Sequence, residues 1–207
     1  RRLAAMRDQW SGTLVFVVQP AEEIVAGAKA MMADDLYKRF GTPDYALGWH
    51  VAAELETGTV GIAEGVTYSA ADTVDIIVHG VGAHGASPHF GKDPVLMGAD
   101  IVGALQSLVG REIAPLNPAV ITVGAFHAGT KHNIISDRAD LWLTVRADDL
   151  ETRDKLIAGI KRISEGVGRK WGMPEGKLPE VRVREDERAI PNVNHAETTQ
   201  RLTRSFV

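Results

Sequence analysis

The sequence predicts a chain of mixed fold, in which an α/β portion is followed by an inserted α+β domain of βαββαβ order. Before residue 66, a strand, a helix and a second strand follow one another with short connections, which is typical of a parallel sheet. Between residues 67 and 186, strand and helix patterns alternate in the order of an antiparallel sheet that carries two helices on one face. With 207 residues, the chain is long enough to hold both parts.

The first part has the pattern of a βαβ unit. Apolar residues spaced for one face predict a helix over residues 2–10. The uninterrupted apolar run at 14–18 predicts a strand buried on both faces of a parallel sheet. A helix is expected over 26–36, and a second short strand over 45–49. These elements predict part of a larger α/β sheet.

The inserted part carries the clearest strand pattern of the chain, because apolar and polar side chains alternate over residues 139–146. Asp93-Pro94 is typical of a helix start, and Asp148 with Glu151 forms a capping-box pattern before a second helix. The predicted strands cover 74–79, 120–126, 139–146 and 181–184, with helices over 94–109 and from 148 to about 171. This order predicts a ferredoxin-like layout. A last helix is expected from about residue 195.

The composition is that of a globular protein rather than of a disordered or fibrous one. Hydrophobic residues make up 44% of the chain and charged residues 24%, and the net charge is −4. This balance gives no electrostatic reason to expect nucleic acid or anionic lipid, and no apolar run reaches the ~20 residues of a membrane helix. We therefore expect a soluble, cytoplasmic chain with neither nucleic acid nor membrane as a partner. Because the chain starts at Arg1 and not at methionine, we also expect a piece of something longer.

Candidate metal-binding and catalytic residues follow the two strands predicted in the first part. Glu22 and Glu23 come just after the strand at 14–18, and His50 comes at the end of the strand at 45–49. The carboxyl ends of parallel strands meet at one edge of a sheet, so these side chains are expected to face one crevice. A carboxylate and an imidazole can hold a divalent ion, and a second carboxylate can activate a water. The alternative is that the paired glutamates only favour the positive end of the next helix.

The inserted part holds three further candidates. A glycine-dense loop carries His84 and His89, which could meet a ligand or could be solvated surface side chains. Asn133 could donate a hydrogen bond to a substrate carboxylate or carbonyl, or could be an ordinary turn residue. Arg146 lies on the polar face of its strand, where it could hold a carboxylate or pair across strands. His79, His127 and His195 carry no pattern and are read as structural or exposed.

Together, these segments resemble a known family. The matching pieces are VFVVQPAEE, GAKAMMADD, LGWHV, GAHGASPH, the long segment from DPVLMGAD to HNIISD, and LTVRADD, which cover most of residues 12–150. In order and spacing they are similar to the metal-dependent amidohydrolase, aminoacylase and carboxypeptidase family, and within it to the hippurate hydrolase-like branch that hydrolyses N-acyl amino acids. The resemblance implies a two-metal α/β catalytic domain with an inserted ferredoxin-like lid that is used for dimerisation. It implies that residues 1–66 belong to the catalytic domain, 67–186 form the lid, and 187–207 return to the catalytic domain.

The resemblance also implies a role for each candidate residue. Glu22 matches the general acid/base and Glu23 a metal ligand. His50 matches a ligand of the second metal, so that two divalent ions (zinc, manganese, cobalt or nickel) are implied. His84 matches the lid histidine that reaches the partner subunit's active site and stabilises the oxyanion. Asn133 and Arg146 match lid residues that hold the substrate's carboxylate.

The sequence departs from the family pattern at several points. Ile24-Val25-Ala26 stands where the family usually has glycines, and Ser136 replaces a usual proline. An upstream cysteine–histidine metal motif and a far C-terminal histidine ligand have no counterpart. We therefore expect a fragment that lacks the N- and C-terminal parts, with an incomplete metal site and no activity by itself. The alternative is a non-catalytic lid-type module that dimerises or binds small acids.

Overall fold

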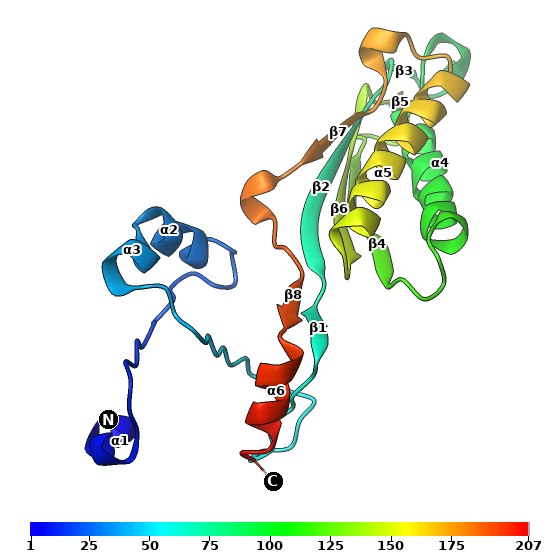
Figure 1. Cartoon of the computed structure of the whole chain (residues 1–207). Helices are drawn as coiled ribbons and strands as arrows, with labels where there is room; N and C mark the ends of the chain where they lie inside the picture. The colour runs from blue at the N-terminus through cyan, green and yellow to red at the C-terminus, as the bar shows by residue number, and fades with distance from the viewer. Residues whose placement is uncertain (207) are drawn as a thin grey trace. The chain divides into compact units, whose positions relative to one another are not determined.

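The computed structural model describes residues 1–206, and their contacts divide them into two units. The first unit is Arg1–Ala53 and the second begins at Glu54. Each unit is described by itself below, and Figure 1 shows their elements.

The first unit contains short helices but, in its described residues, no strand. Its helices are α1 (Arg2–Ala5), a 3₁₀ turn η1 (Arg7–Gln9), α2 (Gly27–Ala33) and α3 (Leu36–Phe40). The expected helix over 26–36 is broken at Asp35, whose backbone is left-handed with φ of 59°. The strands expected over 14–18 and 45–49 are wrong, and their side chains are exposed, with Phe16 86% accessible. A strand buried on both faces needs hydrogen-bonded neighbours on both sides, and no described strand pairs with these segments.

The second unit is built on a four-stranded antiparallel sheet. Its strands are β2 (Ala70–His79), β4 (Ala119–Ala128), β6 (Arg138–Ala147) and β7 (Glu180–Val183), in the order β4-β6-β2-β7. Helices α4 (Pro94–Ser107) and α5 (Leu150–Lys170) cover one face of this sheet (Figure 1). The predicted βαββαβ order and its two-helix layer are confirmed.

The core lies between the sheet and the two helices. Alternate side chains of β6 enter it, and Leu141 and Val145 have no accessible surface. They pack with Ile101 and Leu105 of α4 and with Ile160 of α5, which are also fully buried. The alternation predicted over 139–146 therefore separates a buried face from an open one.

The two helices begin at acidic caps. The Asp93 carboxylate accepts a hydrogen bond from the Val95 N–H (2.9 Å), and Pro94 occupies the first helical position, as predicted. In α5 the cap is Asp149, which accepts from the Thr152 N–H (2.7 Å). The prediction of Asp148 as the cap is wrong, because its carboxylate instead accepts a hydrogen bond from the Ser69 hydroxyl (2.5 Å).

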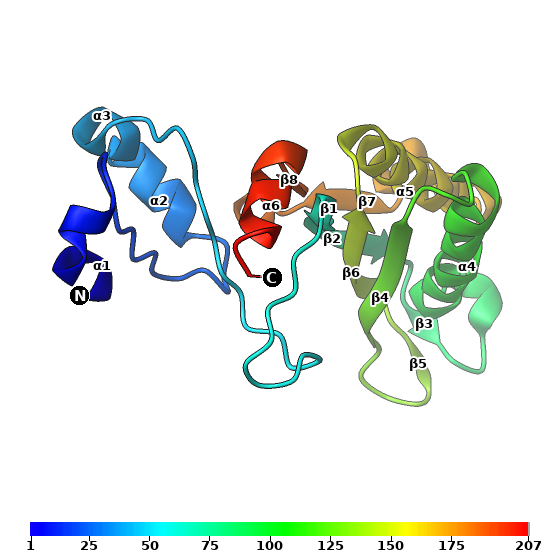
Figure 2. The same cartoon turned by 60° about the horizontal axis from the view of Figure 1, so that its bottom comes forward.

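Two small sheets lie at opposite ends of the four-stranded sheet (Figure 2). At one end, β1 (Gly65–Tyr68) pairs with β8 (Asn192–Asn194), and α6 (Ala196–Thr203) follows. At the other end, β3 (Ala83–His84) pairs with β5 (Ile134–Ile135). We call the residues around β3 and β5, 80–92 and 129–137, the tip.

Four short turns complete the unit. A π-helical turn, η3 (Leu108–Glu112), extends α4. The 3₁₀ turns are η2 (Pro88–Phe90), η4 (Glu175–Lys177) and η5 (Glu185–Glu187).

Candidate active-site residues

Glu22 and Glu23 lie in a tight turn that precedes α2. The N–H of Val25 donates to the Glu22 carbonyl (2.8 Å), and the residues that flank the turn, Ala21 and Val25, have left-handed backbones with φ of 50° and 55°. Such conformations are strained for residues other than glycine, and they are held only where the surroundings require them. Both glutamate side chains are exposed. The turn therefore presents two adjacent carboxylates.

His50 has the hydrogen-bond arrangement of a potential metal ligand. Its Nδ1 lies 2.6 Å from the Val51 carbonyl oxygen, which can only accept a hydrogen bond. Nδ1 therefore carries the proton of the neutral ring, and the lone pair is on Nε2. Histidines that bind metals usually donate from the second ring nitrogen to a carbonyl or carboxylate in this way.

The donor types fit a divalent ion, but the described residues do not assemble a complete site. Glu23 and His50 supply a carboxylate and an imidazole, both of which are ligands of zinc and similar ions. No group of three or more His, Cys, Asp or Glu side chains that could hold a metal is found among residues 1–206.

The structure brings two of the predicted lid residues together at the tip. His84 is paired with Ile134 across β3 and β5, and the Gly85 N–H donates to the Asn133 carbonyl (2.8 Å). A Cβ atom on Gly85 would lie 3.1 Å from the Asn133 backbone, so glycine permits this close approach. Asn133 also has a buried side-chain oxygen without a hydrogen-bond partner in the structure. An orphaned buried acceptor is uncommon, and it marks this position as one that a ligand could complete.

Arg146 is not brought to the same place. It is exposed on β6, where it lies across from Ala71 and Val120, near the end of the sheet that leads to β1. Arg138 begins β6 on the tip side, and Arg146 lies eight positions further along the strand. At about 3.4 Å per residue, this separation is about 27 Å. One small substrate cannot touch Arg146 and the tip of the same chain.

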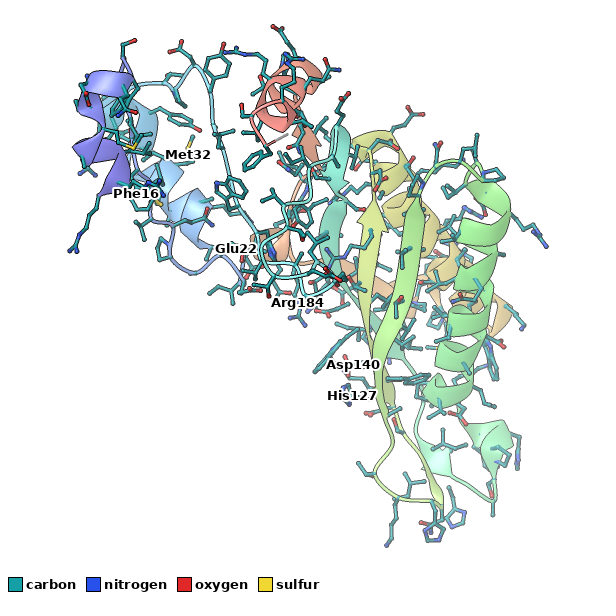
Figure 3. The ribbon with its side chains drawn as sticks, turned by 90° about the horizontal axis from the view of Figure 1, so that it is seen from below. Phe16, Glu22, Met32, His127, Asp140 and Arg184 are labelled. Atoms are coloured by element: carbon teal, nitrogen blue, oxygen red, sulfur yellow. The ribbon has the colours of Figure 1, made fainter. Side chains whose placement is uncertain are left out.

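The open face of the sheet holds a shallow cavity of about 300 Å³ that the sequence did not single out. The His127 ring contacts the Trp142 ring there, with ring centroids 4.5 Å apart and the ring planes tilted by 56°. Figure 3 shows His127 and Asp140 together on this face. His127 is exposed, as predicted, but its place in this cluster was not predicted. The polar residues that alternate along 138–146 were the available signal.

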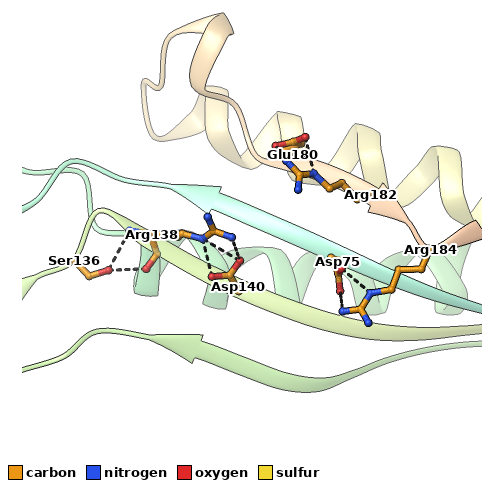
Figure 4. Close-up of polar contacts among 7 residues, drawn as sticks. All are labelled: Asp75, Ser136, Arg138, Asp140, Glu180, Arg182 and Arg184. Carbon is orange, nitrogen blue, oxygen red and sulfur yellow. Dashed lines mark hydrogen bonds and ion pairs between the residues drawn. The ribbon is translucent and has the colours of Figure 1, made fainter. Parts of the chain in front are cut away.

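The charges beside this cavity are already paired (Figure 4). Arg138 binds Asp140 through two nitrogens, and this pairing lowers the pKa of the Asp140 carboxyl. Arg182 likewise lowers the pKa of Glu180. An open sheet face with compensated charges is typical of a surface that faces water, and these arginines do not require an anionic ligand.

Residues 69–172, half of the chain, match the family profile of a peptidase dimerisation domain of the M20 type. The chain belongs to the M20 peptidase dimerisation-domain family. The match falls on the unit with the βαββαβ sheet and confirms the lid predicted from the sequence.

Named relatives agree with this family. Hippurate hydrolase of Campylobacter jejuni is 39% identical over 160 residues, which are 77% of this chain and 42% of that protein. The chain thus spans about two-fifths of the length of this relative. A structure from methicillin-resistant Staphylococcus aureus, described as an aminohydrolase, superposes with a TM-score of 0.86 at 30% identity, over 99% of this chain and 52% of that one. A dinuclear metal-binding peptidase of the M20 family from Bacillus subtilis shares the fold, with a TM-score of 0.72 at 24% identity over 99% and 49% of the two chains.

Among residues 1–206, no helix of this dimerisation-domain protein is long and apolar enough to cross a bilayer.

Proposed function

We propose that this chain forms part of a metal-dependent amidohydrolase that cleaves the amide bond of N-acyl amino acids. The observation that carries the proposal is the tip, where an exposed histidine lies beside an asparagine with an unpartnered buried oxygen. The family match at 69–172 and the name of the hippurate hydrolase relative support the reaction class. The domain division proposed from the sequence is 1–66 for the catalytic part, 67–186 for the lid and 187–207 for the return segment.

Each candidate residue then has a defined task. Glu22 takes a proton from the attacking water and returns it to the leaving amine, which is general acid–base catalysis by one carboxylate. Glu23 and His50 would each hold one of two divalent ions, and these ions would supply Lewis-acid chemistry when bound. His84 donates a hydrogen bond to the carbonyl oxygen as negative charge develops on it. The side-chain NH2 group of Asn133 and the guanidinium of Arg146 donate hydrogen bonds to the carboxylate of the substrate.

The distance along β6 supports a site that is shared between two copies. Arg146 and the tip are about 27 Å apart along the strand, so both can reach one substrate only if they come from different chains. The edge strand β4 supplies a pairing surface, because it is ten residues long and paired only with β6 among the described strands. Exposed edges of this length are usually covered. We therefore propose a homodimer through the lid, as the family description also suggests.

The second candidate function is a non-catalytic lid module that dimerises or binds small acids. The match of residues 69–172 to a peptidase dimerisation domain is the observation in its favour.

An activity measurement on the enzyme that carries this sequence distinguishes the two candidate functions. With zinc, manganese, cobalt or nickel supplied, we expect release of the amino acid from N-benzoyl and N-acetyl amino acids. Glu22→Gln should lower kcat by about a hundredfold or more, since it removes the acid–base group. Glu54→Gln, another exposed glutamate of the chain, is the matched control and should leave kcat unchanged. Equal activity of the two variants would show that Glu22 lacks this role, and light scattering that detects only monomer would contradict the shared site.

A further inference from the structure

We propose that the backbone N–H of Ala86 holds His84 in the tautomer that carries its proton on Nε2, and so presets this side chain as a hydrogen-bond donor to the carbonyl oxygen of a bound amide. The proposal rests on the proposed function only for the identity of the acceptor. The tautomer itself follows from contacts within the tip.

The loop around His84 is fixed by backbone contacts. Val81 and Lys92 exchange two backbone hydrogen bonds of 2.8 and 2.9 Å at the base of the loop. The Ser87 N–H donates to the His84 carbonyl (2.8 Å) and closes a turn directly after the histidine. The β3–β5 pairing holds the other side. The residues that set the position of the His84 ring are therefore ordered without help from its side chain.

One ring nitrogen of His84, Nδ1, faces this turn. The Ala86 N–H donates to Nδ1 of His84 over 3.1 Å. A backbone N–H can only donate, so Nδ1 must present its lone pair. In a neutral imidazole the single proton is then on Nε2. The exposed side chain thus offers an N–H from its outer nitrogen.

This tautomer determines which hydrogen bonds His84 can make. A ring with its proton on Nε2 and its Nδ1 engaged can donate to an oxyanion without a prior proton transfer. It cannot accept a proton or bind a metal through Nε2 while it remains in this form. His50 shows the opposite arrangement, because its Nδ1 faces a carbonyl (2.6 Å) and its lone pair is on Nε2. The backbone therefore prepares the two histidines for different tasks.

The tautomer is measurable in the chain as it stands. With ¹⁵N-labelled histidine, a long-range ¹H–¹⁵N correlation spectrum at a pH where the rings are neutral distinguishes the two tautomers. The His84 signals are identified by their loss in His84→Gln. We expect His84 to show the Nε2–H pattern more completely than the exposed His132, which serves as the reference in the same spectrum. Ala86→Ser keeps the N–H and should keep the pattern, whereas Ala86→Pro removes the donor and should shift His84 toward the mixture of the reference.

A second measurement does not depend on whether the proline variant folds. In His84→Asn the side-chain oxygen occupies a position close to that of Nδ1 and can still accept from Ala86. In His84→Gln the amide group replaces the outer nitrogen, and this acceptor is lost. Hydrogen exchange of the Ala86 amide should therefore stay slow in His84→Asn and quicken about five- to tenfold in His84→Gln, as expected for the loss of one hydrogen bond.

These results are separate from the outcome of the activity assay. An Nδ1–H pattern for His84, or a mixture equal to that of His132, would overturn the tautomer proposal and leave the amidohydrolase proposal standing. Equal exchange of the Ala86 amide in both His84 variants would overturn it as well. Conversely, an inactive enzyme with the Nε2–H pattern intact would count only against the proposed function.

Discussion

Replacement of Asp72 by alanine should destabilise the second unit more than any change to a surface ion pair. The Asp72 carboxylate is fully buried between β2 and α5, and it accepts two hydrogen bonds from the Arg153 guanidinium, one of them 2.9 Å long. The arginine side chain is itself only 9% exposed, and this pairing raises its pKa. Asp72→Ala leaves most of that charge buried without its main partner.

The size of the effect follows from this burial. Removal of one partner from a buried ion pair typically costs about 3–5 kcal/mol, because the remaining charge is uncompensated. Arg153 retains a second partner, Asp154, at 2.7 Å, whose side chain is 67% exposed. We therefore expect a loss near the lower limit, about 3 kcal/mol in the free energy of unfolding.

Urea unfolding followed by circular dichroism measures this loss, provided that the m-value is unchanged. Asp75→Ala is the matched control. Asp75 also binds an arginine, Arg184, but this pair lies on the open face of the sheet, where the two side chains are 22% and 37% exposed. Asp75→Ala should therefore lower the free energy of unfolding by at most about 1 kcal/mol. The double variant Asp72→Ala/Arg153→Met should recover part of the loss, since it removes the buried charge as well. A loss for Asp72→Ala no larger than that of Asp75→Ala would refute the reasoning.

Two further changes in α5 are expected to alter stability. Asp149→Ala should cost about 1 kcal/mol through loss of the helix cap, and Asp149→Asn much less, because the amide oxygen still accepts. The hydrogen bond from the Thr152 N–H lowers the pKa of Asp149 in the folded state, so the charged cap stabilises above the unfolded-state pKa of about 3.9, and this contribution disappears as the pH falls through the lower folded value. An acid titration of wild-type stability that matches that of Asp149→Asn would contradict this. Gly159→Ala should destabilise by about 1 kcal/mol or more, because its Cβ would lie 2.6 Å from the fully buried Leu108. Gly166→Ala meets no atom within 4 Å and should stabilise by up to about 1 kcal/mol, so equal thermal shifts for the two glycine variants would disprove the packing argument.

The inserted domain could be predicted from local sequence because its elements carry local signals. Residues 138–147 alternate between a buried and an open face, and Asp93-Pro94 marks a helix start that needs no distant partner. The first residue of α5 was harder to predict. Asp148 and Asp149 are both suitable caps by type, and the choice depends on Ser69, which lies far away in the sequence and binds Asp148.

The structure of the first unit could not be predicted from its local sequence. The apolar run 14–18 has the composition of a buried strand, but composition does not supply the neighbouring strands that a ladder requires. The break of the expected helix at Asp35 was likewise hidden, because its left-handed backbone is uncommon for a residue other than glycine.

The candidate site could be predicted as a set of residues but not as an arrangement. Spacing and resemblance selected Glu22, Glu23, His50, His84, Asn133 and Arg146, whose roles remain proposals. Their distribution depends on strand register. The β3–β5 pairing joins two of them at the tip, and the length of β6 places Arg146 at the far end. The Ala86 contact that selects the His84 tautomer involves a backbone group, which residue type alone does not reveal.

The pairing of β1 with β8 has a consequence for protein engineering. The chain enters the β-sheet domain and leaves it through two hydrogen-bonded, antiparallel strands, with Gly65 opposite Asn194. Paired strands are about 5 Å apart, so the folded domain presents its two ends as close neighbours. A domain of this kind can be moved into a surface loop of an unrelated host, because its ends impose almost no separation on the loop that receives it. The segment from β1 to β8 is therefore suited to insertion, as one domain, into another protein.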